Sequence, residues 1–154
     1  MSTLEADVII VGGGGAGLAA ALDARRAGAS ALVLEGEETP GGATAISGGG
    51  CSLAGTPLQA ASGIEDSPDL AFADWVRWGQ GAADEEWVRF YVEHTLHDLY
   101  FWLEALGLRW GEVKGQEGNS APRWHRPEGG GKGIWDVLHR ATSQAGVNLV
   151  AGGL

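Results

Sequence analysis

The stretch DVIIVGGGGAGL at residues 7–18 decides the fold of this 154-residue chain. An apolar run leads into a glycine-rich turn, and the turn opens a helical sequence. Three glycines of the turn, Gly12, Gly14 and Gly17, have the G-x-G-x-x-G spacing that binds the pyrophosphate of a dinucleotide. Gly12 allows the tight turn, Gly14 lets the backbone approach the phosphates, and Gly17 lets the helix pack closely on the strand. The first N–H groups of the helix, at the positive end of its dipole, would then face the anion.

The sequence on both sides of this turn predicts a βαβ unit. The run Val8–Val11 is continuously apolar, which is typical of a parallel strand buried on both faces. Residues 18–27 are rich in alanine with helical spacing, and Gly28 is a natural end for that helix. A second apolar run, 31–34, leads to Glu35, which lies 23 residues after the first glycine of the turn. That spacing is close to the ~20 residues expected for the carboxylate that binds the ribose hydroxyls. The alternative is a glycine-rich turn in an ordinary βαβ unit that binds nothing.

The segment after Glu35 distinguishes a flavin from a nicotinamide cofactor. A plain NAD-binding unit would enter its second crossover helix soon after the acid, whereas residues 41–50 here are a loop of small residues, GGATAISGGG. Such a loop allows a large planar ligand to lie against the backbone, with the Thr44 and Ser47 hydroxyls as donors. A flexible Gly/Ser linker is the alternative, which Ile46, the paired glycines and the absence of charge disfavour.

With these motifs the chain resembles the N-terminal part of the FAD-dependent oxidoreductase family that contains the soluble fumarate reductases, the succinate dehydrogenase flavoprotein and the 3-ketosteroid dehydrogenases. The resemblance rests on residues 7–21, 32–35 and 41–50, and on the run RWHRPEGG at 123–130. It implies an α/β fold, a Rossmann-like FAD-binding βαβ sheet with a helical, Trp-rich insertion, incomplete relative to the family. It also implies that the turn holds the FAD pyrophosphate, that Glu35 binds the adenosine ribose, and that the loop follows the ribityl chain and the isoalloxazine. The FAD-binding residues so implied are Gly12, Gly14, Gly15, Ala16, Gly17, Glu35, Gly42, Ala43, Thr44, Ala45, Gly49 and Gly50.

Two departures from the family qualify what the resemblance implies. The membrane-bound succinate dehydrogenase type attaches FAD covalently through a His in the loop after the second strand. No His precedes His94 here, so we expect a non-covalent FAD. Family members are several hundred residues long, and the His and Arg residues that act on their substrates lie downstream of the region matched here. Catalytic residues therefore cannot be assigned in this chain.

The activity that the resemblance implies is that of a flavin-dependent oxidoreductase acting on CH–CH bonds, with hydride passing between flavin N5 and a substrate carbon. Its small-molecule substrate stays open. The segment around Arg126 suggests a dicarboxylate, and a steroid or another activated alkene is the alternative. A missing downstream domain or a partner chain would complete such an enzyme. Two other readings stay open as well: a truncated, non-catalytic FAD-binding fragment, and an NAD-binding Rossmann module, which the small-residue loop disfavours.

The chain changes character near Ser67, because all seven Trp residues follow it. Ser67 and Pro68 predict a helix start, with Ser as the cap and Pro at the first helical position. Apolar residues at three- and four-residue steps predict a longer helix over 83–107, and its aromatic stripe is more typical of core than of a binding platform. His94 and His97 lie three residues apart on this helix without a third ligand, so we interpret them as polar-face residues and expect no metal site.

A polar loop is predicted over residues 111–133. It contains Arg123, His125, Arg126 and Lys132 in an otherwise acidic chain. Such a local cationic cluster could meet a carboxylate substrate or a phosphate. A solvated surface loop is the alternative.

The remaining sequence returns to the sheet. Residues 134–145 have helical spacing, and the apolar run 147–150 predicts a third strand beside the first. We therefore expect a dinucleotide-binding part over 1–66, a helical insertion with the polar loop over 67–133, and a returning helix and strand over 134–154.

Composition limits the remaining possibilities. The net charge of −10 disfavours nucleic acid and anionic membranes as partners. We expect no signal peptide, and no run approaches the ~20 apolar residues of a membrane span. The one cysteine, Cys51, leaves no internal disulfide, which fits a reducing cytoplasm. Cys51 is more typical of a small buried apolar residue than of a redox group beside a flavin. A chain of this length is expected to form one domain.

Overall fold

The structure is a computed structural model that describes residues 4–152. These residues form two compact units instead of the one domain that the length suggested. The first unit runs to Gly49 and resumes at Gly129, and the second unit is the intervening segment Gly50–Glu128. The second unit is thus an insertion in the first. The predicted organisation with boundaries after residues 66 and 133 stays a prediction.

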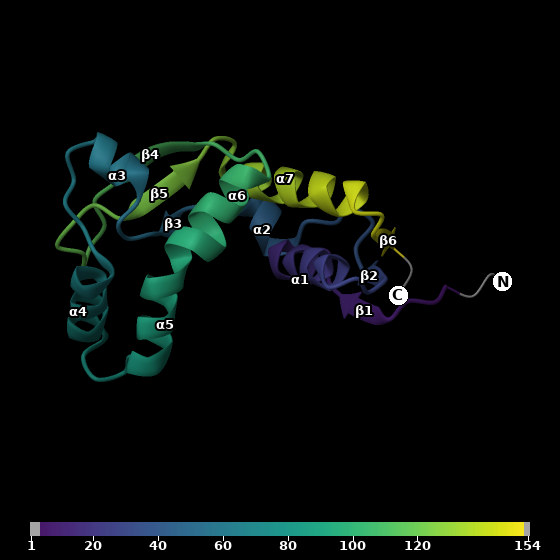
Figure 1. The fold of residues 1–154 in the computed structure, drawn as a ribbon, viewed down its shortest axis with the longest axis horizontal. Coiled ribbons are helices and arrows are strands. Elements are labelled where there is room, and N and C mark those ends of the chain that lie inside the picture. The colour runs from purple at the N-terminus through teal and green to yellow at the C-terminus, as the bar shows by residue number, and fades with distance from the viewer. Residues whose placement is uncertain (1–3, 153–154) are drawn as a thin grey trace. The chain divides into compact units, whose positions relative to one another are not determined.

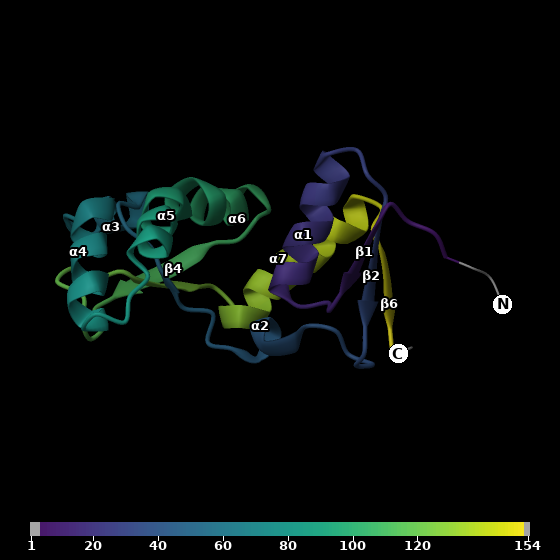
Figure 2. The same cartoon turned by 90° about the horizontal axis from the view of Figure 1, so that it is seen from below.

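A parallel three-stranded sheet forms the centre of the first unit, in the order β1–β2–β6 (Figure 2). Strands β1 (Val8–Val11) and β2 (Ala31–Glu35) lie where the sequence predicts them. Strand β6 (Asn148–Ala151) pairs with β2, with Leu149 opposite Val33, so the prediction of a third strand beside the first is wrong. The sheet follows the 3-2-1 strand order of a Rossmann half, in which the third strand extends the sheet beyond the second.

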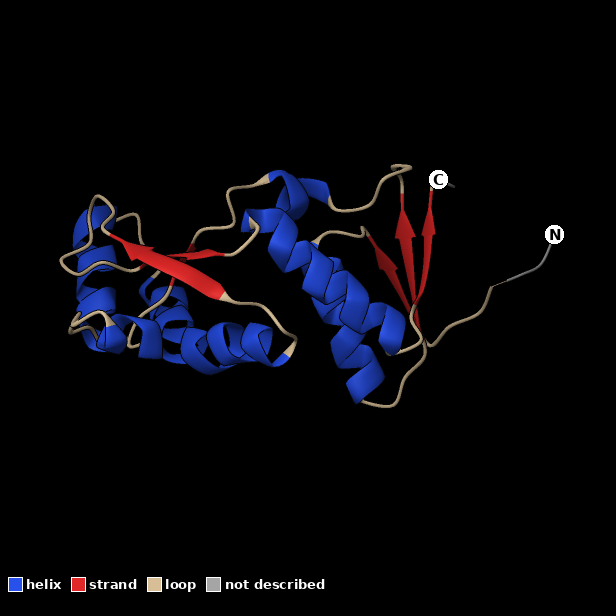
Figure 3. Cartoon of the chain, turned by 90° about the horizontal axis from the view of Figure 1, so that it is seen from above, coloured by secondary structure: helices blue, strands red, loops and turns tan. Residues whose placement is uncertain are grey.

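Helices α1 (Gly15–Arg26) and α7 (Gly130–Gln144) lie on one face of this sheet (Figure 3). A small apolar core between helices and sheet contains buried Ala21 and Val33, and Ile10 packs against it. The prediction that β1 is buried on both faces is wrong, because Ile9 is 58% and Val11 77% exposed. Alternate side chains of a strand point to opposite faces, so Ile9 and Val11 point away from the core against which Ile10 packs. An apolar run predicts a strand but does not specify what covers it.

A short helix, α2 (Gly42–Ile46), occupies the segment for which the sequence predicts a loop. Helix α7 also begins four residues earlier than predicted, and its first turn lies directly against α2. A Cβ at Gly131 would overlap the carbonyl oxygen of Thr44, and the Gly131 N–H donates to the carbonyl of Ser47 at 3.2 Å. The small residues of this segment therefore allow close helix packing, which the loop prediction did not consider.

Three helices of the second unit have starts that are capped by side chains. The Ser67 hydroxyl accepts from the Leu70 N–H at 3.2 Å, which confirms the predicted helix start. Helices α4 and α5 pack side by side (Figure 1), and the stacked rings of Trp75 and Tyr91, 4.9 Å apart, lie in their apolar core. Tyr91, which belongs to the aromatic stripe predicted over 83–107, thus packs against the core, as predicted. The helices are α3 (Pro57–Ala61), α4 (Pro68–Gly79) and α5 (Glu85–Thr95).

The long helix predicted over 83–107 is present with an interruption. It runs as α5, then as the π-helical segment η1 (Leu96–Phe101), and then as α6 (Trp102–Ala105). Val92 and Leu103 of the predicted stripe are buried. The exposed His94 stacks on the Phe90 ring at 4.1 Å, and its Nδ1 lies 2.7 Å from the Phe90 carbonyl. Among residues 4–152, no three His, Cys, Asp or Glu side chains gather as metal ligands.

An antiparallel sheet in the order β3–β5–β4 completes the second unit. Its strands are β3 (Cys51–Ser52), β4 (Trp110–Lys114) and β5 (Trp124–Pro127). The prediction of a polar loop over 111–133 is therefore wrong, since most of two strands and the start of α7 lie in that segment. Nowhere in residues 4–152 is a helix long and apolar enough to span a bilayer.

Candidate cofactor site

The glycine-rich turn between β1 and α1 has the geometry that its sequence predicts. Gly12 has a φ of +106°, a left-handed conformation that a side chain rarely adopts, and its N–H donates to the Leu34 carbonyl at 2.7 Å. A Cβ at Gly17 would overlap the carbonyl oxygen of Gly12. Gly12 is therefore required for the turn, and Gly17 for the close packing of α1 on it.

Gly14 lies in the middle of the turn, with space around its Cα. The nearest atom to a Cβ built there is the Gly41 carbonyl oxygen, 3.7 Å away, so the site would be open to a ligand at ordinary contact distance. Among residues 4–152 the Gly14 N–H has no acceptor, whereas its carbonyl accepts from the Leu18 N–H at 3.0 Å. This arrangement fits a backbone that approaches an anion and donates to it.

Glu35 at the end of β2 lies beside the turn. Its Oε2 accepts from the Gly13 N–H at 2.7 Å, and its Oε1 accepts from the Glu37 N–H at 3.1 Å. These backbone bonds, that of Glu37 first and that of Gly13 second, hold the pKa of the Glu35 carboxyl below its usual range. The carboxylate thus stays ionised at neutral pH and reaches both the turn and the first residues after the strand.

Two hydroxyls of the α2 segment bind backbone groups. The Thr44 Oγ1 accepts from the Gly15 N–H at 3.0 Å. The Ser47 hydroxyl donates to the Thr44 carbonyl at 3.0 Å and accepts from the Gly49 N–H at 3.2 Å. The proton of Ser47 is thus used within the protein, which does not fit the prediction that this hydroxyl donates to a ligand.

The predicted FAD-binding residues fall mostly within the first unit. The turn, Glu35 and the α2 segment up to Gly49 belong to it, and Gly50 begins the second unit. Gly49, with a φ of +72°, fits against the backbone of Gly130, where a Cβ would overlap the chain. A Cβ at Gly50 would overlap the Trp124 indole, so this glycine is required for packing inside the second unit.

The sequence did not indicate the role of Trp135 in this region. Its indole Nε1–H donates from α7 to the carbonyl of Gly13 at 2.9 Å. The two residues are 122 positions apart, and no local pattern marks such a contact.

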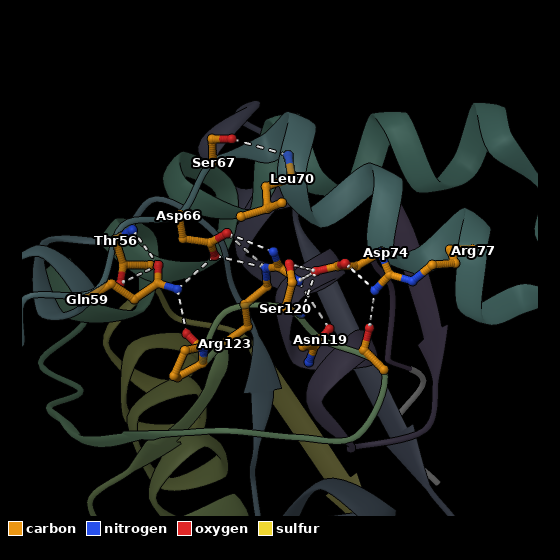
Figure 4. A network of polar contacts seen from close by, with 12 residues as sticks. Thr56, Gln59, Asp66, Ser67, Leu70, Asp74, Arg77, Asn119, Ser120 and Arg123 are labelled. Carbon is orange, nitrogen blue, oxygen red and sulfur yellow. Dashed lines mark hydrogen bonds and ion pairs between the residues drawn. The ribbon is translucent and has the colours of Figure 1, made fainter.

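The predicted cluster of four cations does not form. Figure 4 shows Arg123 bound to the carboxylates of Asp66 and Asp74. The Arg123 side chain is 1% exposed, and both carboxylates are buried. Its Nε and Nη2 each lie 2.8 Å from an oxygen of Asp66, and its Nη1 lies 2.6 Å from Asp74 Oδ2. Arg126 lies at the surface, 3.9 Å from Glu112, and Lys132 pairs with Asp136 at 2.7 Å. Each cation thus has its own protein partner.

Asp74 and His125 are the other buried ionisable groups of this network. Burial raises the pKa of Asp74, but bonds from Ser120, Arg123 and Arg77 outweigh it and hold that pKa well below its usual range. His125 Nδ1 lies 2.6 Å from the Arg123 carbonyl, so Nδ1 carries the proton and Nε2 accepts from the Thr56 hydroxyl at 2.7 Å. Burial lowers the pKa of His125 and keeps it neutral. The network is a structural one with its polar groups paired.

Cys51 lies on β3, opposite His125. Burial raises the pKa of its thiol to about 11. A thiol with so high a pKa is a poor nucleophile, in keeping with its interpretation as a small apolar residue.

The first unit therefore defines a dinucleotide-binding domain of the Rossmann type, with parallel strands, a G-x-G-x-x-G turn and an acid at the end of the second strand. The chain matches the model of the FAD binding domain family over residues 7–153, and it belongs to that family. FAD is accordingly its cofactor.

Similar proteins are oxidoreductases. The fumarate reductase (cytochrome) of Shewanella frigidimarina is 36% identical over 146 residues, which cover 93% of this chain and 25% of that protein. A KsdD-like steroid dehydrogenase of Mycobacterium tuberculosis is 36% identical over 156 residues, 89% of this chain and 27% of that protein. The open conformation of a flavocytochrome c3 fumarate reductase superposes with a TM-score of 0.88 at 33% identity, over 96% of this chain and 26% of that one. The predicted family is confirmed, and the chain spans about a quarter of the length of the relatives it matches.

Proposed function

We propose that this chain is the FAD-binding part of a flavin-dependent oxidoreductase that acts on CH–CH bonds. The observation that carries the proposal is the glycine turn, whose Gly14 N–H has no acceptor among residues 4–152, within a chain of the FAD binding domain family. When bound, FAD would supply hydride transfer at its flavin N5. The chain's own residues would bind and orient it.

The residues proposed to bind FAD have different tasks. Gly12 and Gly17 shape the turn, and the free N–H of Gly14 with the next N–H groups of the first turn of α1, those of Ala16 and Gly17, would bind the pyrophosphate. Glu35 would accept from the ribose hydroxyls, since its carboxylate is ionised and lies beside the turn. We propose that the flavin end is bound along the α2 segment, by Gly42, Ala43, Thr44, Ala45, Gly49 and Gly50.

The FAD is proposed to be non-covalent. Residues 36–50, the loop in which a His anchors the flavin of some family members, contain no His, Cys or Tyr. The nearest thiol, Cys51, has a raised pKa and is therefore weakly nucleophilic. A side chain suited to attack the flavin is thus lacking from that segment.

The substrate class is proposed from the relatives. Fumarate reductases and steroid dehydrogenases are similar to this chain at the same 36% identity, so a dicarboxylate and a steroid or other alkene are both candidates. The segment around Arg126 no longer favours the dicarboxylate, because Arg123 and His125 are buried in a structural network. We propose no catalytic residue within this chain, and a further domain or partner chain would supply those groups. A cytoplasmic location is proposed from the single cysteine.

The visible spectrum of the purified chain tests the cofactor and its attachment. We expect flavin absorption that is retained on gel filtration and released into the supernatant by acid precipitation. Flavin that stays with the precipitate would overturn the non-covalent mode. A chain that binds no FAD on reconstitution, and binds NADH instead, would overturn the proposed function.

Turnover assays with fumarate and with a ketosteroid, using an artificial electron donor or acceptor, test the activity. Bound FAD with no turnover of either would favour the alternative of a non-catalytic FAD-binding fragment. That alternative is based on the share of the relatives that this chain covers, about a quarter of their length. Turnover of one substrate would assign the substrate class.

A further inference from the structure

The glycine turn is fixed from outside by side chains of three different elements. Glu35 at the end of β2 accepts from the Gly13 N–H, and Thr44 of α2 accepts from the Gly15 N–H. Trp135 of α7 donates to the Gly13 carbonyl at 2.9 Å. Both polar groups of Gly13 are thus bound by side chains, although the residue itself has none.

We propose that Trp135 is a positioning residue of the FAD site, which orients the peptide group that presents the Gly14 N–H to the pyrophosphate. The inference rests on the proposed function and extends it to a residue outside the glycine motif. In a trans peptide the carbonyl of one residue and the N–H of the next point in opposite directions. All peptide bonds of the described residues are trans, so a Gly13 carbonyl held by Trp135 directs the Gly14 N–H away from α7.

The neighbouring peptide groups of the turn are fixed by other contacts. The Gly12–Gly13 peptide donates to Glu35, and its carbonyl lies against Gly17. The Gly14–Gly15 peptide donates to Thr44 and accepts from the Leu18 N–H. Without the indole N–H, the Gly13–Gly14 peptide alone would lack a bond that sets its orientation. Glycine flanks this peptide on both sides, so the backbone offers little resistance to its rotation.

The first turn of helix α7 is fixed by close packing against α2. Its first turn lies against α2 without any Cβ between them, since a side chain at Gly131 would overlap the Thr44 carbonyl and the Ser47 hydroxyl. The Trp135 ring also stacks on His139 at 4.5 Å with an interplanar angle of 11°. The stacking fixes the orientation of the ring, and the packing of α7 against α2 fixes the position of its backbone. Together they direct the indole N–H to the Gly13 carbonyl.

Trp135→Phe in the full 154-residue chain tests the proposal, because Phe keeps an aromatic ring to stack on His139 and removes the donor. We expect the Kd for FAD, measured by quenching of flavin fluorescence well below the Tm, to rise about five- to tenfold, the factor of one neutral hydrogen bond. In the FAD-free protein, we expect faster hydrogen exchange of the Gly13 and Gly15 amides. Trp87→Phe is the matched control, since Trp87 is 66% exposed in the second unit.

The outcomes separate this inference from the proposed function. An unchanged Kd and unchanged amide exchange in a folded Trp135→Phe protein overturn the role of Trp135 while FAD binding stands. A lower Tm with an unchanged Kd overturns it as well, because only a structural role would remain. If the wild-type chain binds no FAD, the proposed function fails, and amide exchange still tests the bracing of the turn. If Trp135→Phe does not fold, replacement of Trp135 by 3-benzothienylalanine, which keeps the shape of the indole and lacks its N–H, tests the same hydrogen bond, with a weaker FAD Kd expected and an unchanged Kd contradicting the role of Trp135.

Discussion

The two units use polar groups in opposite ways. In the second unit, the Arg123 guanidinium is enclosed and satisfied by Asp66 and Asp74, and neither carboxylate is exposed. In the first unit, the glycine turn is fixed by three side chains and still leaves the Gly14 N–H without an acceptor among residues 4–152. A satisfied buried network stabilises a fold, whereas a held but unsatisfied donor beside open space is suited to a ligand. Charge and motif in the sequence do not distinguish the two, since the glycine turn and the segment around Arg123 are both predicted to bind an anion.

The largest effect is expected where the charge network is broken. Arg123→Ala leaves the buried Asp66 carboxylate without a cation and the buried Asp74 carboxylate with Arg77 alone, and we expect the free energy of unfolding to fall by about 3–5 kcal/mol. Urea denaturation measures this change. Arg126→Ala, three residues further along on strand β5, is the control, because that side chain is 51% exposed and its loss should cost less than about 1 kcal/mol. Similar losses for the two variants would show that the network is not the structural centre of the second unit.

The next effect concerns the packing under the turn. Gly17→Ala places a Cβ on the Gly12 carbonyl oxygen, and relief of that overlap must shift the turn or the helix. We expect FAD to bind about 100-fold more weakly, a loss of about 2.7 kcal/mol, measured by fluorescence titration. Gly36→Ala is the matched control, because no atom lies within 4 Å of a Cβ built there. An unchanged FAD affinity in Gly17→Ala would mean that the turn does not contact the cofactor.

A smaller effect is expected at the acid beside the turn. Glu35→Gln keeps the size of the side chain but loses the charge, and an amide can accept only through one of its two ends. The Gly13 and Glu37 N–H groups would then compete for one oxygen. We expect FAD affinity to fall on the order of tenfold, as for the loss of one hydrogen bond to a charged group. Calorimetric titration with FAD and with FMN checks this. FMN lacks the adenosine ribose, so an equal loss for both ligands would contradict the ribose role of Glu35.

The elements that the sequence predicts correctly are those determined by residues close to one another in the chain. The strands at 8–11 and 31–35, the helix between them and the cap at Ser67 follow from neighbouring residues, and the structure has them. The spacing of the glycine motif also predicts why glycine is needed at two of its positions. Gly12 has a positive φ, and Gly17 allows the close packing of α1 on the turn.

Contacts between distant residues account for what the sequence did not predict. The sequence predicts Arg123 in a polar loop, whereas the structure buries it directly before strand β5. That burial is possible because Asp66 and Asp74, 57 and 49 positions away, neutralise its charge. Trp135 reaches Gly13 across 122 positions. The exposure of Ile9 and Val11 has the same origin, since an apolar run does not show which element covers it. Burial of a charge depends on a partner, and hydropathy within a short window contains no information about that partner.

The smallest effect is a pH dependence that belongs to the second unit alone. Burial lowers the pKa of His125 below its ordinary value of about 6.5, so below that pH the unfolded chain binds a proton that the folded chain does not. This contribution to stability is complete above pH ~6.5 and is lost as the pH falls from there to the folded pKa, by at most about 1.4 kcal/mol per pH unit. Urea denaturation between pH 7.5 and 5 measures the slope. His125→Gln should flatten it. An equal slope in wild type and His125→Gln would contradict the neutral, hydrogen-bonded His125. FAD affinity compared over the same range would then show whether a pH effect also reaches the first unit.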